Sequence, residues 1–143
     1  MLSNSSKYAV KAVLFLALHS SEDHKIMVKN IAKPINVPLA YIAKLLQELS
    51  KQNLISSTRG PKGGFYLTAE NKNQSVINIL KIIDGENILT GCMLSLEKCN
   101  ELKPCPLHAI LSPSRKKILK TLKDKTIKEL ALDVEMGNSF LPL

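Results

Sequence analysis

The chain has few aromatic residues and no long apolar run, and each absence excludes a class of protein. Among 143 residues there is no Trp, and there are only three Tyr and three Phe, which argues against a protein that binds single strands by stacking bases on aromatic side chains. No segment approaches the roughly 20 consecutive apolar residues that span a bilayer. The apolar run at residues 12–18 follows Lys7 and Lys11 but has no small-residue cleavage site after it, so it does not match a signal peptide. We therefore expect a cytoplasmic protein with no membrane partner.

Cysteine is also scarce. Three cysteines in a reducing cytosol do not suggest a set of structural disulfides. No two of them have the spacing of two to four residues that zinc sites favour. An enzyme with Cys105 as nucleophile and His108 as base would need an oxyanion site and a third, orienting group, and the sequence supplies neither. We expect that the protein is not an enzyme.

Positive charge is in excess, and it lies mostly in the first half of the chain. The chain carries 20 Lys and Arg against 12 Asp and Glu, a formal net charge of +8. Residues 1–74 hold ten of these cations and only four of the acidic residues. A solvated, lysine-rich surface would give the same numbers, but a basic half is also the electrostatic footprint of a nucleic-acid-binding domain.

The most informative segment is the turn Thr58-Arg59-Gly60-Pro61-Lys62-Gly63-Gly64. It lies between two short β-prone runs, residues 54–57 and 65–68, and thus predicts a hairpin. Glycines supply the positive φ angles of a tight turn, and Pro61 fixes its own φ. The turn would therefore hold Arg59 and Lys62 at an exposed tip, where they can meet a phosphate backbone or a minor groove.

A helix-turn-helix pattern precedes this hairpin. Residues 8–19 are expected to form a buried helix, and residues 28–33 a short helix ended by Pro34. After a turn at 35–37, Pro38 suits the first position of the next helix. That helix places Ile42, Leu45, Leu46 and Leu49 on one inward stripe. Helix, turn, helix and basic hairpin together predict a winged helix-turn-helix, a mainly α fold with a small β-hairpin wing.

The second helix and the hairpin tip predict the DNA contacts. The helix would enter the major groove, and the hairpin would add phosphate or minor-groove contacts. Lys44 and Gln47 are also compatible with a merely solvated face, and Tyr41 with packing against the first helix. Taken together, the DNA-binding residues we predict are Pro38, Ala40, Tyr41, Lys44, Gln47, Arg59, Gly60, Pro61, Lys62 and Gly63.

The rest of the chain predicts helices around an irregular loop. A helix at 76–83 should stop at Asp84-Gly85, followed by the irregular segment 86–105 and a short helical piece at 106–111. A new helix is expected to start at Ser112-Pro113 and run to about residue 123. A capping box at residues 126–129 should open another helix, and residues 137–143 should be loosely ordered.

Cys92, Cys99 and Cys105 all fall in the irregular segment, and His108 follows three residues later. Thiolate and imidazole ligands suit an iron–sulfur cluster or zinc. A thiol redox switch without metal and three inert cysteines are the other interpretations. The spacing by itself does not choose among them.

These motifs together resemble the winged-helix, iron–sulfur or redox-responsive transcriptional regulators of the IscR/NsrR/CymR type. The resemblance is carried by Lys7-Tyr8-Ala9-Val10, Leu39-Ala40-Tyr41-Ile42, the arginine–glycine turn, Ile82-Ile83-Asp84-Gly85 and the cysteine triad ending in Cys105-Pro106-Leu107-His108. It implies a homodimer joined by a long carboxy-terminal helix, about residues 106–124, that acts as a repressor on a near-palindromic operator. The corresponding division is a DNA-binding domain at 1–85, a sensor loop at 86–105, and a dimerisation helix with its tail at 106–143.

The resemblance also implies a ligand set. Cys92, Cys99 and Cys105 match the cluster thiolates, and His108 matches the fourth ligand of the IscR-like branch. Lys7 stands where NsrR-like members have a ligating aspartate, which favours a [2Fe–2S] cluster, one that purification can remove. The chain departs from IscR-like proteins in its first cysteine gap, six residues rather than five, and in Ala43, where they have a glutamate that discriminates between operators. The alternative is a zinc-bound or metal-free winged-helix protein that acts as a thiol redox switch or an interaction scaffold.

Overall fold

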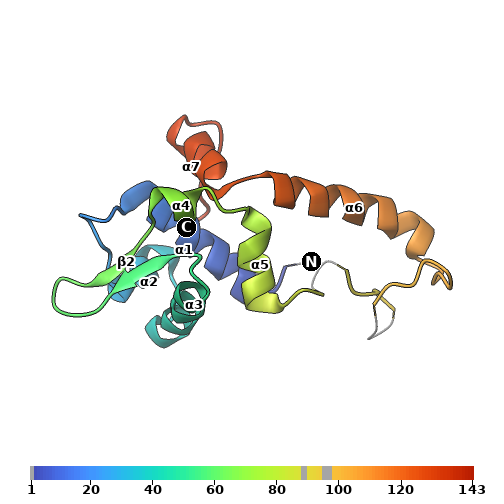
Figure 1. The fold of residues 1–143 in the computed structure, drawn as a ribbon, viewed down its shortest axis with the longest axis horizontal. Helices are drawn as coiled ribbons and strands as arrows, with labels where there is room; N and C mark the ends of the chain where they lie inside the picture. Colours follow the sequence, from blue (N-terminus) through green and yellow to red (C-terminus); the bar gives the residue numbers. More distant parts are fainter. Residues whose placement is uncertain (1, 88–89, 95–97) are drawn as a thin grey trace.

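The computed structural model describes residues 2–87, 90–94 and 98–143, and in these it is mainly helical with one short hairpin (Figure 1). The segment predicted as a sensor loop, 86–105, therefore lies partly outside the described residues. In chain order the elements are α1 Asn4–His19, α2 Val28–Ile35, α3 Leu39–Lys51, β1 Ser56–Thr58, β2 Gly64–Tyr66, α4 Ala69–Lys72, α5 Val76–Asp84, α6 His108–Asp124 and α7 Ile127–Glu135.

Helix α1 is the centre of the core. Its apolar run is buried, with Ala9, Ala12, Val13 and Leu16 fully inaccessible, because helices α2, α3, α5 and α7 all contact it. The Ser3 hydroxyl caps its first turn by accepting a hydrogen bond from the Ser6 N–H. The helix starts four residues earlier than residue 8, where the sequence placed it, since this cap lies upstream of the apolar run.

Helices α2 and α3 form the helix-turn-helix. Ile42, Leu46 and Leu49 of α3 are fully buried and Leu45 is partly buried against the same core, which confirms the predicted stripe. The prediction that α2 ends before Pro34 was wrong, because the helix continues to Ile35. Burial of Ile35 holds this last turn in place, and Asn36 closes it in a left-handed conformation.

Strands β1 and β2 pair antiparallel, with Ser57 opposite Phe65, and we call residues 56–66 the wing. Both strands are displaced from the predicted runs, because Leu54, Ile55 and Leu67 are buried in the core instead of extending the ladder. Gly63 must be glycine, since a Cβ there would lie 2.2 Å from the Thr58 carbonyl oxygen. Gly64, at φ +149°, likewise lets the Ile26 backbone approach and pair with Phe65.

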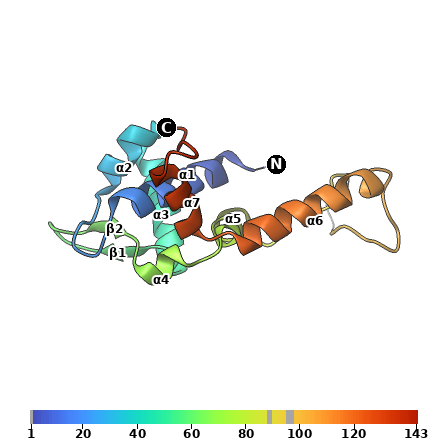
Figure 2. The same cartoon turned by 90° about the horizontal axis from the view of Figure 1, so that it is seen from above.

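Helix α6 extends away from the body formed by the other helices (Figures 1 and 2). It is one helix from His108 to Asp124, so the prediction of a fresh start at Ser112-Pro113 was wrong. Pro113 is tolerated because the carbonyl it leaves without a partner belongs to Ala109, in the exposed first turn of the helix. None of its residues is buried, although Leu111, Ile118 and Leu122 are half-buried.

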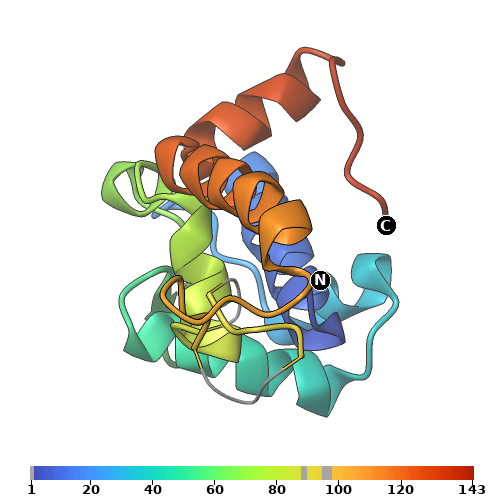
Figure 3. The same cartoon turned by 90° about the vertical axis from the view of Figure 1, so that its right-hand side faces the viewer.

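Helix α7 turns back over α1 (Figure 3). It opens with the predicted capping box between Thr126 and Glu129. Ile127 and Ala131 join the same core as α1. The carboxy-terminal part of the chain therefore includes one element that stabilises the winged helix, in addition to the projecting α6.

Candidate nucleic-acid interface and cysteine site

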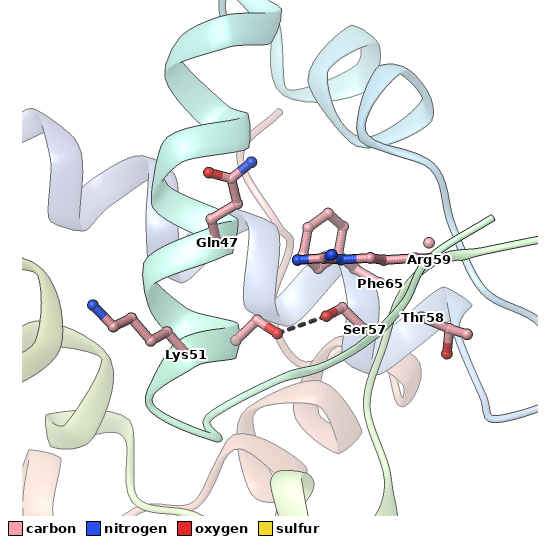
Figure 4. A pocket seen from close by; sticks show the side chains of 8 residues that line it. Gln47, Lys51, Ser57, Thr58, Arg59 and Phe65 are labelled. Carbon is pink, nitrogen blue, oxygen red and sulfur yellow. Dashed lines mark hydrogen bonds between the residues drawn. The ribbon is translucent and has the colours of Figure 1, made fainter.

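A groove of about 550 Å³ separates the recognition helix α3 from the wing. Gln47 of α3 lines it on one side, and Arg59 extends from the wing toward the helix on the other (Figure 4). Lys51 also lines the groove, but its side chain points away from the wing. A hydrogen bond of 2.8 Å between the Ser50 and Ser57 hydroxyls fixes the end of α3 against β1. The groove therefore brings two predicted contact residues, Gln47 and Arg59, to one surface with a defined spacing.

The predicted contact residues lie on this surface with different exposures. Pro38 is the N-cap of α3, and Ala40, Tyr41, Lys44 and Gln47 are exposed along the helix. Arg59, Gly60, Pro61 and Lys62 are exposed at the tip of the wing, whereas Gly63 is buried. The Gly63 N–H donates a hydrogen bond to the Gly60 carbonyl at 2.9 Å. Gly63 therefore shapes the tip of the wing.

Tyr41 is directed toward α1. Its hydroxyl lies 2.6 Å from that of Ser5, and its ring meets Tyr8 edge-on at 5.9 Å between centroids. The side chain keeps 38% of its surface exposed. The structure thus gives Tyr41 the packing role that the sequence left as an alternative, while part of the residue stays exposed.

The first turn of α1 is also tied to the end of α5. The Asp84 carboxylate accepts hydrogen bonds from the Ser3 hydroxyl at 2.6 and 2.8 Å, and another from the fully buried Ser6 hydroxyl. We call Asp84, Ser3 and Ser6 the α1–α5 clasp. A carboxylate at a helix N-terminus also complements the helix dipole. The clasp lies one residue before Gly85, where the irregular segment leaves α5.

Sequence reasoning missed several residues that line the groove. Ser50, Ser57, Thr58 and Phe65 all border it. The alternation of side chains along a strand could have placed Ser57 and Phe65 on a shared face once the register was known. The register of β1 against β2 depends on the geometry of the turn, and the arginine–glycine motif alone did not fix that geometry.

The three cysteines and His108 meet in one small cavity at the start of α6. Cys92, Cys99, Cys105 and His108 line it together with Arg115, and its volume is about 10 Å³, room for about one water molecule. The Cys99 Sγ lies 3.0 Å from the His108 Nδ1. The structure therefore brings all four predicted ligands to one place.

An ion pair lies close to two of the residues that line this cavity, Cys99 and His108. Lys116 pairs with Glu101 at 2.8 Å. Their hydrogen bond raises the pKa of Lys116 and lowers the pKa of Glu101. Among the described residues, no three His, Cys, Asp or Glu side chains are arranged to hold a single metal ion.

Fold and groove together define a winged-helix DNA-binding protein. A family model described as "Rrf2: Iron-dependent Transcriptional regulator" matches residues 2–133. The chain belongs to the Rrf2 family.

Two relatives and one solved structure agree with this assignment. An HTH-type transcriptional regulator of Aquifex aeolicus is 32% identical, across 98% of this chain and 96% of its own. The regulator IscR of Vibrio atlanticus is 30% identical, across 94% of this chain and 77% of its own. The structure of CymR, the global cysteine regulator of B. subtilis, has the same fold, with a TM-score of 0.75 at 21% identity over 92% of this chain and 95% of that one.

These relatives are transcriptional regulators and not enzymes, so the protein is a DNA-binding transcriptional regulator. Within the described ranges, no helix has the length and apolar character needed to cross a membrane.

Proposed function

We propose that the protein is a homodimeric, cytoplasmic repressor whose operator binding responds to an iron–sulfur cluster, of the [2Fe–2S] type, held by Cys92, Cys99, Cys105 and His108. The observation that carries the proposal is the shared cavity of these four side chains. Three thiolates and an imidazole are a donor set that fits such a cluster. The relatives named IscR and the family's description as iron-dependent support the same cofactor.

The DNA contacts in this proposal come from α3 and the wing. Ala40, Lys44 and Gln47 of α3 would meet base edges in the major groove, while Arg59 and Lys62 would meet phosphates or the minor groove. Pro38 sets the start of the helix, and the glycines and Pro61 shape the wing tip. This division corresponds to a DNA-binding domain at 1–85, a sensor loop at 86–105 and a dimerisation segment at 106–143.

Dimerisation is assigned to α6, because its 17 residues include none that is buried within one chain. Leu111, Ile118 and Leu122 recur along one side of the helix and remain half-exposed, a stripe that a second copy would cover. Two copies would place their recognition helices in half-sites about one helical turn, roughly 34–36 Å, apart on a near-palindromic operator.

The packing of α6 on α5 links the proposed cluster site to the DNA-binding domain. The sensor loop, residues 86–105, connects α5 with α6, and His108 is the first residue of α6. When bound, the cluster supplies a redox-active centre. Ordering of the loop by its four ligands would fix the start of α6 relative to α5, and would so change the spacing of the two recognition helices.

Anaerobic purification followed by visible spectroscopy and quantification of iron, sulfide and zinc tests the ligand set. We expect close to two iron and two sulfide per chain in the wild type. Cys99→Ala should lose the cluster and keep the helical circular dichroism signal, while Ser112→Ala, which alters another residue of the cavity wall, should retain both. A Cys99→Ala protein that still assembles a full cluster would contradict this ligand set.

A thiol redox switch is the second candidate, favoured by the fold shared with CymR and by the joint placement of three thiols. Two of them would form a disulfide, giving two electrons and two protons to a peroxide. A colourless protein that stays metal-free after reconstitution, and whose DNA binding changes with peroxide and recovers with dithiothreitol, would favour this function. Stoichiometric zinc without specific DNA binding would instead favour an interaction scaffold.

A further inference from the structure

Two exposed apolar side chains on the winged helix have no role in the contacts described above. Within the described residues 2–87, the large apolar side chains that are exposed are Met27 at 46%, Leu39 at 53% and Tyr41 at 38%. The contacts with Ser5 and Tyr8 explain Tyr41. Met27 and Leu39 are the N-cap of α2 and the first residue of α3.

Met27 and Leu39 border the same hollow on the DNA-facing side. It has a volume of about 340 Å³, and its other walls include Gly60, Gly63 and Phe65 of the wing. Thr58, Gly64 and Phe65 line both this hollow and the groove that holds Arg59. The hollow therefore continues the candidate DNA interface from the wing to the amino-terminal end of the recognition helix.

We propose that Leu39 is a specificity-determining residue that packs against the 5-methyl group of a thymine in the major groove, with Met27 as the neighbouring wall. The proposal rests on the DNA-binding surface assigned above and names a base that this surface selects. The amino-terminal residues of a recognition helix are the ones that reach base edges. In the major groove, thymine differs from the other bases by its methyl group, which apolar side chains contact.

Leu39 is not needed to hold the wing in place, so packing against the wing does not explain why it is exposed. Phe65 is held by backbone pairing with Ile26, at 2.9 and 2.8 Å for the two N–H···O bonds, and it packs against the core. More than half of the Leu39 surface stays in contact with solvent, and an exposed leucine gains free energy only when a partner covers it. A DNA duplex is the partner that fits this face, because the adjacent turn of the wing carries the cations Arg59 and Lys62, which can bind phosphate.

The test replaces thymine by deoxyuridine, which removes only the methyl group. A duplex is first selected from a random library with the full-length protein, and each thymine is then replaced in turn. We expect one position in each half-site where the replacement weakens wild-type binding about three- to five-fold, the effect of burying roughly one methyl group. Leu39→Ala should bind the duplex with thymine and the duplex with deoxyuridine at that position equally well.

Two matched variants separate this contact from a general loss of binding. Leu132→Ala, a similarly exposed leucine on α7, should keep the full sensitivity to deoxyuridine. Leu39→Met, which preserves an apolar side chain, should retain most of the sensitivity to deoxyuridine.

Two results would overturn the assignment. Either the wild type is insensitive to deoxyuridine at every position, or Leu39→Ala binds more weakly while keeping the full sensitivity. If the folded protein enriches no sequence from the library, the DNA-binding surface is contradicted, and so is the proposed role of Leu39. This outcome differs from the two above because no operator would be obtained.

Discussion

At the scale of single residues, Arg59 is the side chain on which we expect the proposed DNA interface to depend most. It is exposed at the tip of the wing and also lines the groove facing α3, so the same cation can reach a phosphate and stay close to the recognition helix (Figure 4). Phosphate contacts give affinity without sequence preference, because every duplex offers the same backbone.

We predict that Arg59→Ala weakens binding to every duplex by a similar factor and lowers the slope of log affinity against log salt by about one. The measurement is a fluorescence-anisotropy titration at several salt concentrations, with Lys128→Ala on α7 as a control that also removes one cation. An unchanged salt slope in Arg59→Ala would show that the wing does not contact phosphate.

The arginine–glycine turn shows how far single residues could be predicted. Its composition was enough to predict a shaped, basic tip, since the backbone at Gly63 tolerates no Cβ. The groove-lining Ser50 and Phe65 carry no such signal, because a serine at the end of a helix and a phenylalanine in a strand fit many environments. Their roles follow from the register Ser57–Phe65, which only the three-dimensional pairing sets.

At the scale of elements, the α1–α5 clasp connects the start of the central helix with the base of the cysteine loop. Asp84 accepts hydrogen bonds from Ser3 and Ser6, and the next residue but one on α1, Tyr8, packs on Tyr41 of the recognition helix. The amino-terminal part of α1 therefore touches both α5, which precedes the loop, and α3, which carries the proposed DNA contacts.

We predict that Asp84→Asn lowers the free energy of unfolding by about 1–2 kcal/mol, because hydrogen bonds to a carboxylate and its interaction with the helix dipole are both weakened. Urea unfolding followed by circular dichroism measures this. Asp133→Asn, at an exposed position near the end of α7, is the control and should change stability by no more than a few tenths of a kcal/mol. Equal stability of Asp84→Asn and the wild type would contradict the clasp.

Most elements could be predicted from apolar spacing and capping residues, and two of the errors, in α2 and α6, involved proline. Helix α2 continues through Pro34 and α6 through Pro113. In each case the missing N–H falls near a helix end, where packing of Ile35 or solvation of the first turn compensates for it. The sequence rules took Pro34 as the end of one helix and Pro113 as the start of another, and they do not include this compensation.

At the scale of the whole molecule, α6 is a long helix that projects from the body and has no fully buried residue, although it packs on α5 (Figure 2). A helix with a half-exposed apolar stripe is stable when a second apolar surface covers it. The proposed partner is a second copy, which would also bring a second recognition helix to the same duplex.

We predict that Ile118→Glu, which places a charge in this stripe, converts a dimer to a monomer and weakens operator binding at least ten-fold. Sedimentation velocity and operator titration measure the two effects. Lys117→Glu introduces the same residue at the adjacent, exposed position and should remain dimeric. A monomeric wild type would contradict the proposed dimer, and a dimeric Ile118→Glu would assign dimerisation to another surface.

The convergence of the cysteines could be predicted only in part. Their spacing and the resemblance to known regulators suggested that Cys92, Cys99, Cys105 and His108 act together, and the structure brings them to one cavity. The contact of Cys99 with His108, and the Glu101–Lys116 pair beside it, depend on how the loop folds against α6. No periodicity governs an irregular loop, so its packing was beyond a reading of the sequence.

The most direct test of the central claim is the ratio of operator dissociation constants between the cluster-loaded and cluster-free wild-type protein, measured anaerobically on one preparation. The account predicts a clear difference, at least ten-fold, that disappears in Cys99→Ala and persists in Ser112→Ala. The same dissociation constant for loaded and cluster-free protein would leave the DNA-binding regulator in place and contradict its control by a cluster at the cysteine site.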